Sequence, residues 1–120
     1  PEEHMGMWKG MRVIVCSHTL AAATHAEVWS RDVATRIRAL KAEPGKDIWL
    51  FGGGDLFRTL LDAGVVDDIE VAYVPVLVGG GIPLRALPAT QHRLTLSEHR
   101  VYEKSGTVMV TYAAPTASET

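Results

Sequence analysis

The segment from residue 48 to residue 64, "IWLFGGGDLFRTLLDAG", constrains the fold more than any other part of the sequence. Residues 48–51 form a short apolar run without polar alternation, which is typical of a strand covered on both faces of a sheet. Leu56 and Leu60 recur at helical spacing, Asp55 is a candidate N-cap, and Gly64 is suited to end the helix. The segment therefore predicts a strand, a tight glycine turn and a helix in direct succession.

The glycine turn itself predicts a binding site. Gly52, Gly53 and Gly54 leave backbone N–H groups with little side-chain cover at the start of a helix, which favours phosphate or pyrophosphate binding. The alternative is a tight turn whose glycines serve only left-handed backbone conformations. The common dinucleotide motif does not fit, because position 57 is Phe57, and no Gly-Lys-Ser/Thr follows as in a P-loop.

The remaining pattern predicts an α/β fold. The expected elements are a strand over residues 12–17, a helix over residues 30–45 with Ser30 as N-cap, a strand over residues 69–78 that contains Pro75, and a β-hairpin of residues 92–103 and 107–113. Helices that alternate with strands imply a mainly parallel sheet with helices on its faces, extended here by the C-terminal antiparallel hairpin. We expect a single domain over residues 1–120, with residues 1–10 and 114–120 flexible.

A second group of polar side chains follows the first expected strand. Ser17, His18 and Thr19 supply two hydroxyls and an imidazole, which can hold a phosphate or a ribose. Ligands of open α/β sheets bind beyond the carboxyl ends of the strands, so we expect this group and the glycine turn on one rim of the sheet. The alternative is ordinary turn chemistry of a serine and a threonine.

Composition excludes several function classes. The net charge of −2 gives no electrostatic case for nucleic acid or an anionic membrane. Cys16 is the one cysteine, so no intrachain disulfide can form, and its apolar surroundings predict a buried core thiol. The five histidines show no metal-ligand spacing, so no metal is assigned. We expect a cytoplasmic protein.

Three stretches together resemble a known family. They are "VIVCSHTL", "DIWLFGGGDLFRTLLDAGVVDDIEVAYVPVLVGGGIPL" and the final hairpin, and the similarity runs from about Met11 to Ala113. The chain is similar to the dihydrofolate reductase-like family that includes the C-terminal reductase domain of the bifunctional riboflavin-biosynthesis deaminase/reductase. Members usually begin with a strand, a "SLDG"-like segment and a helix near "GRKTYE", and nothing similar precedes Met11. We therefore expect either a piece of a longer protein or two chains that complete the sheet as a homodimer.

The resemblance also implies a cofactor and a reaction. It implies a dihydrofolate reductase-like fold and an NADPH-dependent oxidoreductase that passes a hydride to a pterin-like or pyrimidine-like small molecule. By resemblance, Ser17, His18 and Thr19 would lie near the adenosine 2′-phosphate end of NADPH. The pyrophosphate would lie against residues 52–54 and the start of the next helix, Asp55 and Leu56. No catalytic residue is assigned. The alternatives are a nucleotide-binding or assembly module of the same fold without activity, and a structural domain whose glycines serve only turns.

Overall fold

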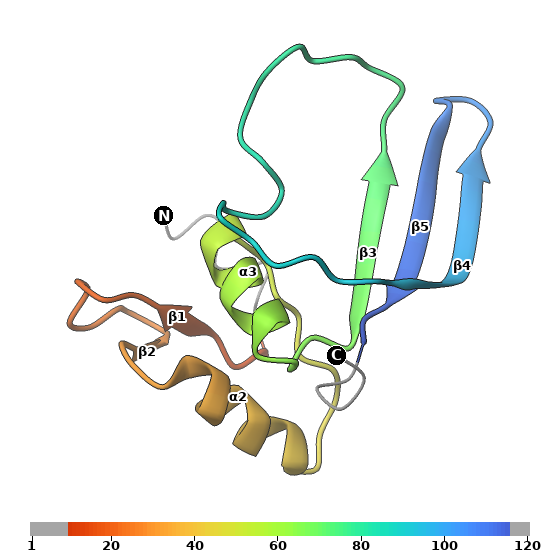
Figure 1. Ribbon diagram of the computed structural model, residues 1–120. Coiled ribbons are helices and arrows are strands. Elements are labelled where there is room, and N and C mark those ends of the chain that lie inside the picture. The colour runs from red at the N-terminus through yellow and green to blue at the C-terminus, as the bar shows by residue number, and fades with distance from the viewer. Residues whose placement is uncertain (1–9, 116–120) are drawn as a thin grey trace. The chain divides into compact units, whose positions relative to one another are not determined.

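A computed structural model describes residues 10–115 (Figure 1). The chain divides into two compact units, residues 1–43 and residues 44–120. The elements are β1 (Ile14–Cys16), β2 (Glu27–Trp29), α2 (Val33–Ala42), α3 (Gly54–Asp62), β3 (Asp68–Tyr73), β4 (Thr95–Tyr102) and β5 (Thr107–Ala113). The chain is thus a mixed α/β protein, as the sequence predicts. The terminal ranges expected to be flexible lie almost entirely outside the described residues.

The first unit pairs two short parallel strands. β1 lies within the predicted strand, and Val15 of β1 is in register with Val28 of β2. The sequence analysis missed β2 and treated its residues as a connection, because three residues are too few to show a period. Within β2, exposure falls along the strand from Glu27 to Trp29, whose side chain is buried. Trp29 is the buried apolar anchor among the described residues of this unit.

Helix α2 is shorter than predicted. It begins at Val33, and its N-cap is Asp32 in the left-handed conformation (φ 56°) with no side-chain capping bond, so the prediction of Ser30 as N-cap is wrong. Aspartate tolerates this conformation better than most residues. The expected apolar face is confirmed: Ile37 and Leu40 are half-buried while their neighbours along the helix are exposed. The helix ends before Pro44, as predicted.

The second unit confirms the predicted helix after the glycine turn. Gly64 ends α3 in the left-handed conformation (φ 74°), with its N–H bonded to the oxygen of Leu61 (3.0 Å). The N–H of Val65 bonds to the oxygen of Leu60 (3.2 Å). This pair of bonds is the Schellman motif, which satisfies the last carbonyls of a helix. Leu60, Leu61 and Val65 are also buried, so the end of α3 forms part of the core of this unit.

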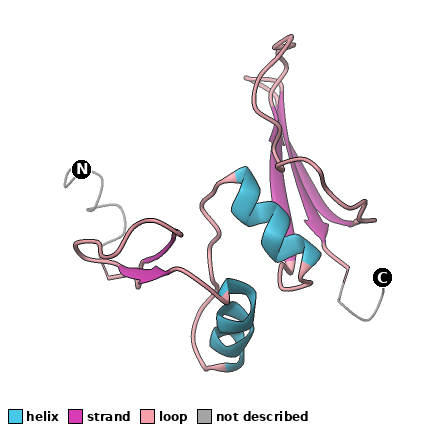
Figure 2. Ribbon diagram, turned by 60° about the vertical axis from the view of Figure 1, so that its left-hand side comes forward, coloured by secondary structure: helices cyan, strands magenta, loops and turns pink. Residues whose placement is uncertain are grey.

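The predicted C-terminal hairpin is also confirmed. β4 and β5 are antiparallel, and β3 pairs with the other edge of β5, also antiparallel, to give the order β3-β5-β4. The turn closes with a bond from the N–H of Gly106 to the oxygen of Tyr102 (2.8 Å), and Gly106 has the positive φ that a tight turn requires. Figures 1 and 2 show α3 beside this sheet, on the side of β3.

Two strand predictions are wrong. Residues 48–51 form no strand in the structure, and β3 ends at Tyr73 instead of continuing to residue 78. A strand exists only where a neighbour completes its ladder of backbone hydrogen bonds, and residues 48–51 belong to neither of the described sheets. Pro75 has no N–H to offer a ladder. The expected mainly parallel sheet is accordingly not confirmed, because only β1 and β2 are parallel among the described strands.

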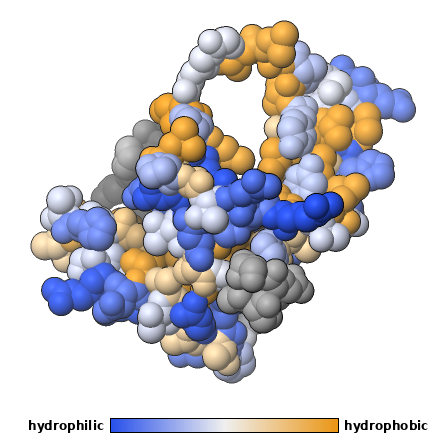
Figure 3. Space-filling view, viewed as in Figure 1, coloured by the Kyte–Doolittle hydropathy of each residue, from blue (hydrophilic) through white to orange (hydrophobic). Residues whose placement is uncertain are grey.

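Residues 74–82, here called the apolar loop, carry much of the exposed hydrophobic surface of the second unit. Leu77 and Ile82 are almost completely exposed (101% and 97%), and Val76 is exposed to 65%. Figure 3 shows hydrophobic residues gathered over this loop, at the top of the view. Within residues 10–115, no helix has the length and apolar character that a membrane crossing requires.

Candidate functional site

The start of α3 presents free backbone donors. Gly53 is the N-cap and makes no side-chain capping bond, and the first helical bond runs from the N–H of Phe57 to the oxygen of Gly53 (2.9 Å). The N–H groups of Gly54, Asp55 and Leu56 have no backbone acceptor within residues 10–115. Such groups carry the positive end of the helix dipole. This end of α3 therefore has the electrostatics of an anion site.

The space over the first two glycines is open. A Cβ atom built on Gly52 or on Gly53 would meet no other atom within 4 Å. Gly52 also has a φ of 146°, which a residue with a side chain rarely adopts. A ligand can thus approach this backbone closely, so the turn fits the pyrophosphate group that the sequence analysis expects there.

Gly54 has a different reason to be glycine. Its Cβ would lie 3.1 Å from the oxygen of Leu84 and 3.3 Å from the nitrogen of Ala86, and the N–H of Ala86 donates to the oxygen of Gly54 (3.1 Å). Gly54 therefore lacks a side chain because the backbone of residues 83–86 packs directly against it. Sequence reasoning missed this, because nothing local in the sequence links position 54 to residues 83–86.

Asp55 is the second residue of α3 and Gly53 is the N-cap, so the prediction of Asp55 as the N-cap is wrong. Its side chain is exposed, and its Oδ1 accepts a bond from Nη2 of Arg58 (2.8 Å). The i,i+3 spacing of this acidic and basic pair was visible in the sequence and would have predicted the contact. Leu56 is half-buried and offers the ligand site only its N–H group.

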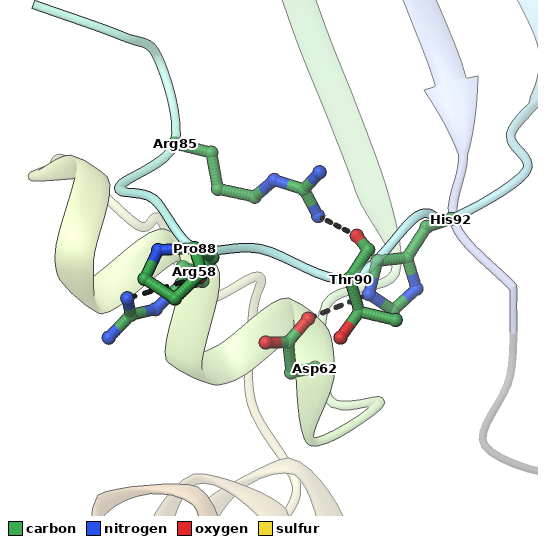
Figure 4. A network of polar contacts seen from close by, with 6 residues as sticks. All are labelled: Arg58, Asp62, Arg85, Pro88, Thr90 and His92. Carbon is green, nitrogen blue, oxygen red and sulfur yellow. Dashed lines mark hydrogen bonds and ion pairs between the residues drawn. The ribbon is translucent and has the colours of Figure 1, made fainter.

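A second set of contacts runs along α3 (Figure 4). Residues 83–92, here called the strap, contact the helix at three successive turns. Besides the bond from Ala86 to Gly54, Arg58 donates from Nη1 to the oxygen of Pro88 (3.3 Å), and Nε2 of His92 lies 2.8 Å from Oδ1 of Asp62. Positions 54, 58 and 62 share one helix face, so the strap covers that face from the first turn to the last.

Two features stiffen the strap. Arg85 donates from Nη1 to the oxygen of Thr90 (2.7 Å), which closes a loop within it. The side chain of His92 is only 7% exposed, so its contact with Asp62 is largely shielded from water. The bonds between the strap and α3 hold residues 83–86 close to the glycine turn, and they join residues about thirty positions apart.

The polar group after β1 is a structured turn. The oxygen of Ser17 accepts bonds from the N–H groups of Thr19 (3.3 Å) and Leu20 (3.1 Å), while His18 and Thr19 are exposed. The serine thus performs the turn chemistry that the sequence analysis weighed, and its hydroxyl proton is still free to reach a ligand. That this turn shares a rim with the glycine turn stays a prediction, because the two belong to different units.

Cys16 is half-buried rather than fully buried. Burial raises the pKa of its thiol, so the reactive thiolate is scarce at neutral pH. This supports the expectation of an inert core thiol. In the described part of the chain, no three His, Cys, Asp or Glu side chains gather closely enough to hold a metal ion together.

A groove of about 210 Å³ lies in the first unit, lined by Arg12, Trp29, Arg36, Ala39, Leu40 and Glu43. Both guanidinium groups already have partners. Arg12 donates two bonds to the carboxylate of Glu27 (2.5 and 3.0 Å), and Arg36 lies 5.3 Å from the centroid of the Trp29 ring. The hydrogen bond from Arg12 lowers the pKa of Glu27. The groove is therefore a weaker candidate for anion binding than the glycine turn.

Comparison with known proteins gives three further findings. The model of the RibD C-terminal domain family matches residues 1–108. The Bacillus subtilis (strain 168) protein YyaP is 30% identical over 116 residues, which cover 93% of this chain and 61% of that protein. YwjB of the same organism is 38% identical over 45 residues, covering 38% of this chain and 26% of that protein.

A solved structure from Shewanella sp. PV-4, whose name suggests a role in riboflavin biosynthesis, superposes with a TM-score of 0.74. The sequence identity is 20%, and the match covers 88% of this chain and 62% of that one. At this identity the match establishes a shared fold. The chain spans less than two thirds of the length of each of these relatives.

Proposed function

Because the chain belongs to the RibD C-terminal domain family, we propose that it is an NADPH-dependent reductase of the riboflavin-pathway type. The substrate class is a pterin-like or pyrimidine-like small molecule with a reducible imine or carbonyl. The observation that carries the proposal is the glycine turn at the start of α3, which combines free N–H groups with open space over Gly52 and Gly53. The bound cofactor supplies the hydride.

The chain's own residues bind and orient the cofactor in this account. The N–H groups of residues 52–56 hold the pyrophosphate, and the positive end of the helix neutralises part of its negative charge. The hydroxyls of Ser17 and Thr19 and the imidazole of His18 contact the 2′-phosphate end. No catalytic residue is proposed, because the carboxylate nearest the turn, Asp55, is exposed and paired with Arg58.

A second function, nucleotide binding without chemistry, is favoured by one observation. Within residues 44–115, the contacts around the glycine turn offer amide donors and an ion pair but no buried acid poised to protonate a substrate. Both functions require nucleotide binding, and only the first requires turnover.

We also propose that the protein acts as a homodimer. Residues 48–51 are apolar and belong to neither described sheet, and the apolar loop exposes Leu77 and Ile82 almost fully. A second copy that covers these parts would supply the missing strand neighbours and would restore the mainly parallel sheet expected from the sequence. A standard interface buries about 800 Å² on each partner. Light scattering at micromolar concentration should give twice the 13.0 kDa chain mass, and Leu77→Lys should lower it; a stable wild-type monomer contradicts the dimer.

The function is tested by binding first and turnover second. Binding is measured as the shift in the heat-unfolding temperature when NADPH, NADH or ATP is added. Turnover is measured as the oxidation of NADPH in the presence of dihydrofolate or a reducible aminopyrimidine. Gly53→Ala should fold normally, since Gly53 has an extended backbone and open space around it, yet should weaken NADPH binding about tenfold or more by blocking a charge-assisted bond. Gly80→Ala is the matched control, also in open space, and should leave affinity unchanged. Binding without turnover supports the second function, and absence of binding removes both.

A further inference from the structure

Asp55 raises an electrostatic difficulty for an anion site at the start of α3. Its carboxylate lies in the first turn with 77% of the side chain exposed. A negative charge in the first turn is attracted to the same positive helix end that would bind a phosphate. An unpaired Asp55 would therefore compete with an anionic ligand for the N–H groups and would repel it.

Arg58 removes much of this difficulty. Its Nη2 lies 2.8 Å from Oδ1 of Asp55, and its Nη1 donates to the oxygen of Pro88 (3.3 Å). Only 26% of the Arg58 side chain is exposed, so the guanidinium is held in place rather than moving freely in solvent. Figure 4 shows the guanidinium of Arg58 beside Pro88 of the strap.

The strap is itself fixed to both ends of the helix. The N–H of Ala86 bonds to the oxygen of Gly54 at the first turn, and His92 contacts Asp62 at the last. The carbonyl of Pro88 lies between these two anchors and therefore has a defined position. The contacts form a series in which the strap holds Arg58 and Arg58 holds the Asp55 carboxylate.

We propose that Arg58 is a positioning residue of the anion site: it neutralises Asp55 and keeps that carboxylate away from the N–H groups of the glycine turn. This inference rests on the proposed function, because the site it acts on is the one expected to hold the cofactor's pyrophosphate. Arg58 acts through Asp55 and need not touch the ligand. It therefore makes the turn selective for multiply charged ligands, which gain most from removal of a nearby negative charge.

A double-mutant cycle tests this inference, with NADPH and inorganic pyrophosphate as probes. Arg58→Met should weaken binding of both about two- to fivefold, the effect of one unbalanced charge at a helix N-terminus. Asp55→Asn should bind as tightly as wild type or more tightly. The double variant should recover the affinity that Arg58→Met loses, because the repelling charge is gone. Arg100→Met, which removes a guanidinium that lies over the Tyr102 ring on β4, is the matched control and should leave affinity unchanged.

The outcomes separate three cases. Recovery of affinity in the double variant without recovery of unfolding stability supports positioning through Asp55. If the double variant binds as weakly as Arg58→Met or more weakly, Arg58 binds the phosphate directly and the inference is overturned. If wild type binds neither NADPH nor pyrophosphate, the proposed function fails and the inference falls with it.

Discussion

Gly54→Ala is the substitution that most sharply separates the two reasons for glycine in the turn. The new methyl group would lie 3.1 Å from the oxygen of Leu84, 3.3 Å from the nitrogen of Ala86 and 3.4 Å from the oxygen of Pro83. All three neighbours are backbone atoms, which cannot rotate away as a side chain can. The strap must therefore shift away from the first turn of α3.

The magnitude follows from opposing contributions. Alanine gains up to about 1 kcal/mol over glycine in a helix, and less in its first turn. Overpacking against a fixed neighbour costs about 1–3 kcal/mol, and weakening the bond from Ala86 to Gly54 costs about 1 kcal/mol more. The net prediction is a loss of about 1–4 kcal/mol in the free energy of unfolding.

Urea unfolding followed by circular dichroism measures this loss as a lower midpoint at constant slope. Gly53→Ala is the control, because it adds the same methyl group one position earlier in open space and should leave the midpoint nearly unchanged. If the Gly54→Ala variant is at least as stable as wild type and Gly53→Ala, residues 83–86 do not pack against the first turn of α3. The described contact between the strap and the helix would then be wrong.

Two other predictions concern stability. Leu61→Ala should cost about 2–5 kcal/mol, since Leu61 is buried in the core of the second unit, whereas Leu56→Ala at the half-buried position should cost less in the same urea assay. Glu27→Gln should lower stability at neutral pH. The hydrogen bond from Arg12 lowers the pKa of Glu27 in the folded protein. The ion pair therefore stabilises the wild type fully at pH values above the pKa of an ordinary glutamate, and this stabilisation is lost as the pH falls through the lowered pKa. The two unfolding curves should therefore converge in acid, and a constant difference at all pH values would contradict the ion pair.

The helix and the hairpin were predictable because their signals are local. Leu60 and Leu61 fall on the buried face of α3 that the leucine spacing indicates, and Gly64 ends the helix with the positive φ that glycine allows. The hairpin is specified by alternation on both sides of a short turn. Each of these elements is determined by residues within one or two turns along the chain.

The wrong and missed predictions depend on distant residues. The apolar run of residues 48–51 has the composition of a strand, but pairing requires a neighbour that composition cannot supply. β2 is too short to show a period. The contacts of the strap, such as His92 with Asp62 and Arg58 with Pro88, join positions thirty residues apart, so no local pattern announces them. The expected role of Gly52 and Gly53 stays a prediction that the open space supports.

The most direct test of the central claim observes the amides of the glycine turn during titration with NADPH. In a ¹⁵N-labelled chain, the amide signals of residues 52–56 should shift saturably with NADPH and with pyrophosphate, and those of residues 17–19 should shift with NADPH. NADH should move the first group and leave the second nearly unchanged, because it lacks the 2′-phosphate. If NADPH saturates the protein while the signals of residues 52–56 stay in place, the glycine turn is not the anion site and the account is wrong.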